Sequence, residues 1–112
     1  MGYYEIFPID RRELEKLLES GNENAIVEAL LSAAYYDPDW RWVQGQCLRF
    51  LDHADRNVRW NAATCLGHVA RIHRNLDLEL VLPRLLVLKG DASIAPSVEE
   101  ALADIRFFLR VH

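Results

Sequence analysis

The chain has 112 residues, of which 51% are hydrophobic and 27% are charged. This balance is typical of one folded domain and excludes a disordered chain, so we expect a single domain over residues 1–112. The net charge of −4 argues against a general nucleic-acid binder, which is usually basic. Residues 1–20 contain Pro8 and several charges in place of an apolar run, and no segment is apolar for the length of a bilayer span. We therefore expect neither a signal peptide nor a membrane partner.

The charges are unevenly distributed along the chain. Residues 1–40 carry nine acids and three bases, a local net charge of −6, whereas residues 41–90 carry eight bases and four acids. An acidic N-terminal third suits a basic partner surface. A solvated helix face would have the same composition, so both interpretations remain open here.

Hydrophobic residues recur every three or four positions and predict six helices. Pro8 makes residues 1–9 irregular, and Asp10, followed by Glu13, has the spacing of a capping box. The predicted helices run from Asp10 to Ser20, from Asn22 to Tyr36, from Asp37 or Asp39 to Leu51, from Asp55 to His73, from Leu78 to Leu88 and from Pro96 to Val111.

The run from Leu80 to Leu88, within the predicted helix from Leu78 to Leu88, is the one place where a strand is an alternative. It contains branched apolar residues, and Pro83 fits a helix only near the first turn or at a kink. We predict a helix here because the neighbouring segments are helical. The fold class is therefore all-α.

The chain also contains an internal repeat. Segments starting at Asp37, Asp55 and Asp91 each have a large apolar residue three positions later and a leucine eleven positions later. The offsets of 18 and 36 residues correspond to one helix and to one helical pair, so we expect each aspartate to cap a helix. Arg41 and Arg59 share a repeat position. In helical repeats of this type such an arginine often pairs with an aspartate of the neighbouring repeat, so we expect a structural role ahead of one in partner binding. Small residues, in particular Gly45, Ala62, Ala63 and Gly67, are expected to allow close helix packing.

From Asp55 to Gly67 the sequence resembles the second helix of a HEAT repeat: an aspartate turn, Val-Arg, a small pair and Leu-Gly. The resemblance covers residues 37–109. It implies about six helices in a short, right-handed, HEAT-like α-solenoid. Domains of this kind mostly bind other proteins through exposed helix faces.

A narrower resemblance rests on the segments from Tyr35 to Trp40 and from Cys65 to His73. These segments look like those of small bacterial immunity proteins of contact-dependent growth-inhibition or related polymorphic toxin systems. The resemblance implies a non-enzymatic protein that binds one cognate toxin domain, often a nuclease, and covers its active site in a one-to-one complex. The alternative is a scaffold or nucleic-acid-binding HEAT-repeat protein that uses the arginines of residues 41–90.

The candidate partner-binding residues combine acids with aromatic side chains. Two carboxylates flank Pro38 at a turn, where they could accept basic groups of a partner, although helix capping explains them more simply. Two tryptophans share a repeat position and could stack into a half-exposed ridge, or they could fill gaps between helices. The candidates are Tyr35, Tyr36, Asp37, Asp39, Trp42 and Trp60.

The sequence predicts no catalytic, cofactor or metal site. His68 and His73 are five positions apart and so lie on different helix faces, whereas a zinc-binding pair on a helix needs a spacing of three or four. Cys47 and Cys65 lie in apolar stripes, which predicts buried free thiols. Buried thiols without a disulfide framework are typical of a reducing compartment, so we expect a cytoplasmic protein.

Overall fold

The computed structural model describes residues 5–110, which form six α-helices and no strand. The helices are α1 (Arg11–Leu18), α2 (Glu23–Tyr36), α3 (Trp40–Phe50), α4 (Arg56–His73), α5 (Leu78–Leu88) and α6 (Ala95–Leu109). The all-α prediction is therefore confirmed, and each predicted helix is present within a few residues of its expected bounds. Residues 1–4 of the predicted irregular start and Val111 of the predicted last helix lie outside the described residues.

Side-chain hydrogen bonds cap the starts of α1, α2 and α4. The Asp10 carboxylate accepts a hydrogen bond from the Glu13 amide (2.9 Å), and the Asn22 side chain accepts one from the Ala25 amide (2.9 Å). At α4 the Asp55 carboxylate accepts from the Asn57 amide (2.8 Å). Each cap satisfies a backbone N–H that has no partner within its helix, which explains why the sequence located these helix starts well.

The expectation that all three repeated aspartates cap helices is wrong at two positions. Helix α3 is capped by Asp39, whose carboxylate accepts from the Trp42 amide (3.1 Å), rather than by Asp37. Helix α6 starts only after Ile94, and Asp91 instead accepts hydrogen bonds from the amide and hydroxyl of Ser93. Asp91 thus orders the turn before α6, and only Asp55 has the predicted role.

Pro83 lies further into its helix than we expected. It is the sixth residue of α5, beyond the first turn, and the helix continues to Leu88. The side chain of Pro83 is exposed. Because proline has no N–H, one backbone bond of α5 is missing at this point.

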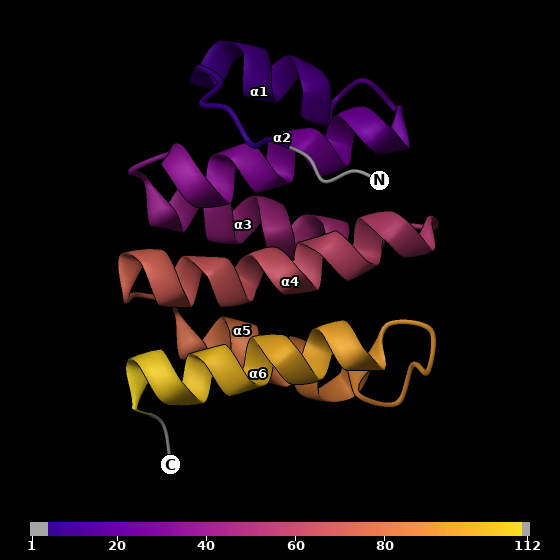
Figure 1. The fold of residues 1–112 in the computed structure, drawn as a ribbon. Coiled ribbons are helices and arrows are strands. Elements are labelled where there is room, and N and C mark those ends of the chain that lie inside the picture. Colours follow the sequence, from indigo (N-terminus) through magenta and orange to yellow (C-terminus); the bar gives the residue numbers. More distant parts are fainter. Residues whose placement is uncertain (1–4, 111–112) are drawn as a thin grey trace.

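The helices pack in two layers. Helices α2, α4 and α6 lie side by side in one layer, α3 and α5 lie behind them, and α1 packs against α2 at one end of the stack (Figure 1). Helix α4 is the centre of this arrangement, because it packs against α2, α3 and α6. Each neighbouring pair thus buries a face that a single helix would leave exposed.

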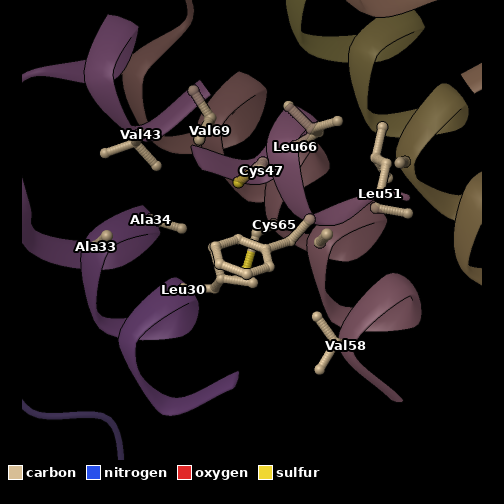
Figure 2. Close-up of a cluster of buried hydrophobic side chains, with 14 of the residues drawn as sticks. Leu30, Ala33, Ala34, Val43, Cys47, Leu51, Val58, Cys65, Leu66 and Val69 are labelled. Atoms are coloured by element: carbon tan, nitrogen blue, oxygen red, sulfur yellow. The ribbon is translucent and has the colours of Figure 1, made fainter. Parts of the chain in front are cut away.

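The core is built around the contact of α4 with α2 and α3 (Figure 2). Leu30, Val43 and Leu66 contribute to it with no exposed side-chain surface. Cys47 and Cys65 are free and fully buried in the same cluster, which confirms the prediction that both are core residues. The hydrogen bond with Cys47, together with burial, raises the pKa of the Cys65 thiol well above its ordinary value, so the thiol stays protonated.

Close packing depends on one of the two glycines singled out by the sequence. A Cβ atom at Gly67 would lie 3.1 Å from the Ala101 Cα and 2.9 Å from the Asp104 carboxylate, so α6 needs a residue without a side chain here. Gly45 is exposed, and a Cβ there would meet nothing within 4 Å. The packing role is confirmed for Gly67 and wrong for Gly45. Ala62 and Ala63, the other small residues, are fully buried.

We predict opposite effects of the same substitution at these two glycines. Gly45→Ala should raise the free energy of unfolding by about 0.5–1 kcal/mol, because alanine favours the helix and nothing obstructs its Cβ. Gly67→Ala should lower it by about 1–3 kcal/mol, because the backbone of α6 must move. Urea unfolding followed by circular dichroism measures both. A stabilising Gly67→Ala would contradict the close α4–α6 contact.

Candidate protein-binding surface

The turn between α2 and α3 carries the two candidate carboxylates, but it does not present both to solvent. The Arg11 guanidinium of α1 donates two hydrogen bonds to Asp37, from Nε to Oδ2 (3.1 Å) and from Nη2 to Oδ1 (3.0 Å). The side chain of Asp37 is 9% exposed and that of Asp39 is 56% exposed. The prediction that both carboxylates are available to a partner is therefore wrong for Asp37, because Arg11 neutralises its charge within the chain. Asp39 is the more exposed of the two, although its Oδ2 also lies 3.6 Å from Arg11 Nη2.

Burial of Asp37 disfavours its charged form and would by itself raise its pKa. The hydrogen bonds from Arg11 and from the Asp39 amide, and the positive charge of Arg11, act in the opposite direction. Together they hold the pKa of Asp37 below its ordinary value, and the same contact raises the pKa of Arg11. Asp37 is thus a structural residue that ties α1 to the turn after α2.

Substitution of these two aspartates should separate structure from binding. Asp37→Asn should lower the free energy of unfolding by about 1–3 kcal/mol at pH 7, because it weakens a paired, charge-assisted contact. Asp39→Asn should cost less, since asparagine also caps helices well. Urea midpoints at pH 7 measure both effects.

The effect of Asp37→Asn should also depend on pH. Because the folded-state pKa of Asp37 is lowered, its contribution to stability is present above the pKa of the unfolded chain and is lost as the pH falls through the folded-state value. The difference between wild type and Asp37→Asn should therefore shrink below about pH 4. Equal destabilisation by the two aspartate variants would contradict the structural role of Asp37.

The two candidate tryptophans do not form a ridge. Trp42 lies at the start of α3, where Arg11 stacks on its ring at 3.8 Å. Trp60 lies near the start of α4, where Arg56 stacks on its ring at 4.7 Å. Helices α3 and α4 form an antiparallel hairpin, so these positions are at opposite ends of it. The stacking hypothesis failed because the 18-residue offset relates two antiparallel neighbours and not two equivalent helices.

The two candidate tyrosines, by contrast, lie beside residues that the sequence had not assigned to a binding site. The Tyr35 ring packs edge-on against the His68 ring of α4 (5.1 Å between centroids), and Arg71 lies over Tyr35 at 5.7 Å. Tyr36 is 49% exposed, and its hydroxyl donates to the Ile6 carbonyl (3.0 Å). We call Tyr35, Tyr36, His68 and Arg71 the tyrosine–arginine surface.

His68 is held neutral in this surface. Its burial, and then the charge of Arg71, lower the pKa of His68, and Glu100 opposes them only in part. Arg71 Nη2 lies 3.1 Å from His68 Nδ1. Since arginine can only donate, Nδ1 accepts and the proton is on Nε2. This contact orients both side chains before any partner arrives, which lowers the entropy cost of binding.

The lowered pKa of His68 predicts a pH dependence of stability with a definite sign. Above the ordinary value near 6.5 both folded and unfolded chains hold a neutral imidazole. As the pH falls, the unfolded chain binds the proton first, so stability decreases from about pH 7 down to the folded-state pKa. His68→Gln should flatten this decrease. Urea midpoints between pH 5 and pH 8 test it, and an unchanged slope in the variant would contradict the assignment.

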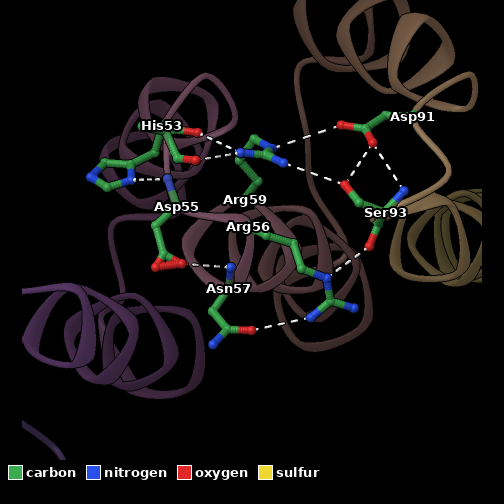
Figure 3. Close-up of polar contacts among 8 residues, drawn as sticks. His53, Asp55, Arg56, Asn57, Arg59, Asp91 and Ser93 are labelled. Carbon is green, nitrogen blue, oxygen red and sulfur yellow. Dashed lines mark hydrogen bonds and ion pairs between the residues drawn. The ribbon is translucent and has the colours of Figure 1, made fainter.

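At the other end of α4, two arginines bind the turn before α6 (Figure 3). Arg59 donates to the carbonyls of His53 (3.0 Å) and Ala54 (2.8 Å), and its Nε lies 3.8 Å from the Asp91 carboxylate. Asp91 belongs to the next repeat segment, so the predicted structural pairing of Arg59 is confirmed. Arg41 does not share it: its guanidinium lies 4.5 Å above the Trp40 ring, and no ion pair of Arg41 occurs among residues 5–110.

Most other arginines of the basic segment are also occupied within the chain. Arg49 pairs with Glu19 (2.8 Å), and Arg84 pairs with Asp52 (2.9 Å). Arg56 donates to the Ser93 carbonyl (3.0 Å), and Arg74 lies over the Phe108 ring at 4.9 Å. A phosphate backbone would have to compete with these contacts, so the geometry does not favour a nucleic-acid interface.

No group of three or more His, Cys, Asp or Glu side chains in the described part of the chain is placed to hold a metal ion. Between residues 5 and 110, no helix has both the length and the apolar character needed to cross a bilayer.

Comparison with solved structures identifies a close relative. One chain in the crystal structure of the CDI complex from Cupriavidus taiwanensis LMG 19424 matches with a TM-score of 0.86 and 39% sequence identity, over 96% of this chain and 97% of that one. This protein belongs to the same family as that chain. No protein-family model matches the sequence, and no curated protein matches it.

The related chain is part of a CDI complex, which agrees with the narrower resemblance to proteins of such systems that the sequence showed. The HEAT-type classification and the right-handed superhelix stay predictions. The roles of the six candidate residues in partner binding also stay predictions, although the structure shows which of them are available.

Proposed function

We propose that this protein is an immunity protein of a contact-dependent growth-inhibition system, which binds its cognate toxin domain one to one in the cytoplasm and blocks the toxin's active site. The observation that carries the proposal is the 39% identity to a chain of a CDI complex across almost the entire length of both chains. At this identity and coverage the whole fold is shared with a chain that forms part of such a complex, and this supports a common binding role.

The tyrosine–arginine surface supports this proposal on physical grounds. Tyrosine and arginine are over-represented among residues that dominate binding energy at protein interfaces. Here they are already oriented by their contacts with His68 and with the Ile6 carbonyl. Asp39, on the adjoining turn, adds a carboxylate that is 56% exposed and only loosely paired with Arg11 (3.6 Å), so a basic group of the toxin can reach it.

The first experiment is to identify the toxin and test neutralisation. The protein, tagged at its C-terminus, is incubated with lysate of cells that express the toxin, and bound proteins are identified by mass spectrometry. The captured toxin domain is then co-expressed with and without this protein. Growth restored only by co-expression, with a one-to-one complex in size-exclusion chromatography, is the expected result. A toxin that remains active in the complex would contradict the proposal.

We predict that Tyr36→Ala and Arg71→Ala each weaken toxin binding by about 1–3 kcal/mol, as expected for truncated interface anchors. The matched control is Arg49→Ala, which removes an exposed arginine that pairs with Glu19 just before α2, whereas the tyrosines lie at the other end of that helix. It should change binding by less than about 0.5 kcal/mol. Isothermal titration calorimetry measures the affinities, and urea midpoints verify folding. Equal losses in all three variants would exclude the tyrosine–arginine surface as the interface.

A further inference from the structure

A pocket of about 600 Å³ lies between the segment of residues 5–9 and helix α2. Two hydrogen bonds hold the segment over the helix: the Ser32 hydroxyl donates to the Phe7 carbonyl (2.6 Å), and the Tyr36 hydroxyl donates to the Ile6 carbonyl (3.0 Å). The pocket is therefore formed before a ligand binds. Its volume falls within the range of sites that take small molecules, so it has ample room for a long side chain.

The walls of the pocket combine apolar surface with negative charge. Phe7, Val27 and Leu31 contribute apolar side chains, and Glu5 and Glu28 contribute exposed carboxylates. No lysine, arginine or histidine is among the described residues that line it, and neither glutamate has an ion-pair partner within residues 5–110. Phe7 is 63% exposed, which leaves a large aromatic face uncovered.

This combination fits a long cationic side chain. The stem of an arginine can lie on the apolar walls while its guanidinium reaches a carboxylate. The flat guanidinium also stacks on aromatic rings more favourably than a lysine ammonium does. The chain itself uses this contact at Arg11 on Trp42 and at Arg56 on Trp60.

We propose that this pocket is the anchor site for an arginine side chain of the toxin. The inference rests on the proposed immunity function, because it assigns the occupant to the toxin. Tyr36 connects the pocket to the tyrosine–arginine surface, since its hydroxyl holds the Ile6 carbonyl and its ring lies 6.3 Å from that of Tyr35. The two regions therefore form one continuous interface, with the local net charge of −6 over residues 1–40 attracting a basic partner.

The first test uses a probe that does not require the toxin. The peptide acetyl-Leu-Arg-Leu-amide is titrated into the ¹⁵N-labelled protein, and chemical shifts are followed by NMR. The control peptide carries citrulline, which has the shape of arginine without its charge. Shifts should concentrate at residues 5–9 and 25–32 for the arginine peptide alone, and Glu28→Gln should weaken its binding about fivefold. The matched control, Glu15→Gln, removes an exposed acid of α1 outside the pocket and should leave binding unchanged.

Three outcomes of this titration would overturn the pocket's assignment: equal binding of the citrulline peptide, equal weakening by Glu15→Gln, or shifts centred on other residues. Binding that is seen only after residues 2–4 are deleted would also overturn it, because the pocket would then be occupied by the start of the same chain.

The second test uses the purified toxin. Glu28→Lys should weaken toxin binding about tenfold, mainly through a slower association rate, whereas Glu15→Lys should weaken it much less. Toxin affinity unchanged by Glu28→Lys would refute the anchor site and leave the immunity function intact. If the wild-type protein binds no toxin, the immunity function fails, and with it the assignment of the occupant to a toxin. The peptide titration still decides separately whether the pocket recognises arginine.

Discussion

The close approach of α4 to α6 at Gly67 is the constraint on which the rest of the structure depends. Helix α4 packs against α2, α3 and α6, and a helix surrounded in this way needs small residues where its neighbours come nearest. Ala62, Ala63 and Gly67 meet this need, with no room left for a Cβ at Gly67. A wider α4–α6 spacing would also separate the hydroxyl of Ser97 from the carbonyl of Trp60, to which it donates across the same contact (2.6 Å).

Ion pairs also lie at both ends of the antiparallel hairpin that α3 and α4 form. At one end Arg11 binds Asp37, and at the other Arg59 joins the turn before α4 to Asp91. Both contacts link segments that are far apart in the sequence: one ties α1 to the turn after α2, and the other ties α4 to the turn before α6. Their charges are also neutralised within the chain.

Local signals made the helices predictable, and non-local contacts limited the prediction of the site. Apolar periodicity and short-range caps such as Asp55 act within a few residues, so they located every helix. The partner of Asp37, in contrast, lies on α1, and no spacing rule links the two residues. His68 and Arg71 could not be assigned to Tyr35 either, because that contact depends on how α2 packs against α4. The repeat register misplaced Trp42 and Trp60 for the same reason: it gave sequence offsets but not helix directions.

The distribution of internal ion pairs decides which charges the molecule presents to a partner. Arg49, Arg59 and Arg84 of the basic segment all pair with carboxylates, so much of the positive charge of residues 41–90 is cancelled at short range. Several acids of the first 40 residues, Glu5 and Glu28 among them, have no such partner in the described part of the chain. The electrostatic potential around α1 and α2 therefore stays negative at distances where the internal ion pairs no longer contribute to it. A basic partner, such as the toxin domain proposed above, would be drawn toward this end, where the pocket and the exposed Tyr36 lie together. Long-range attraction and short-range contacts would then favour the same orientation.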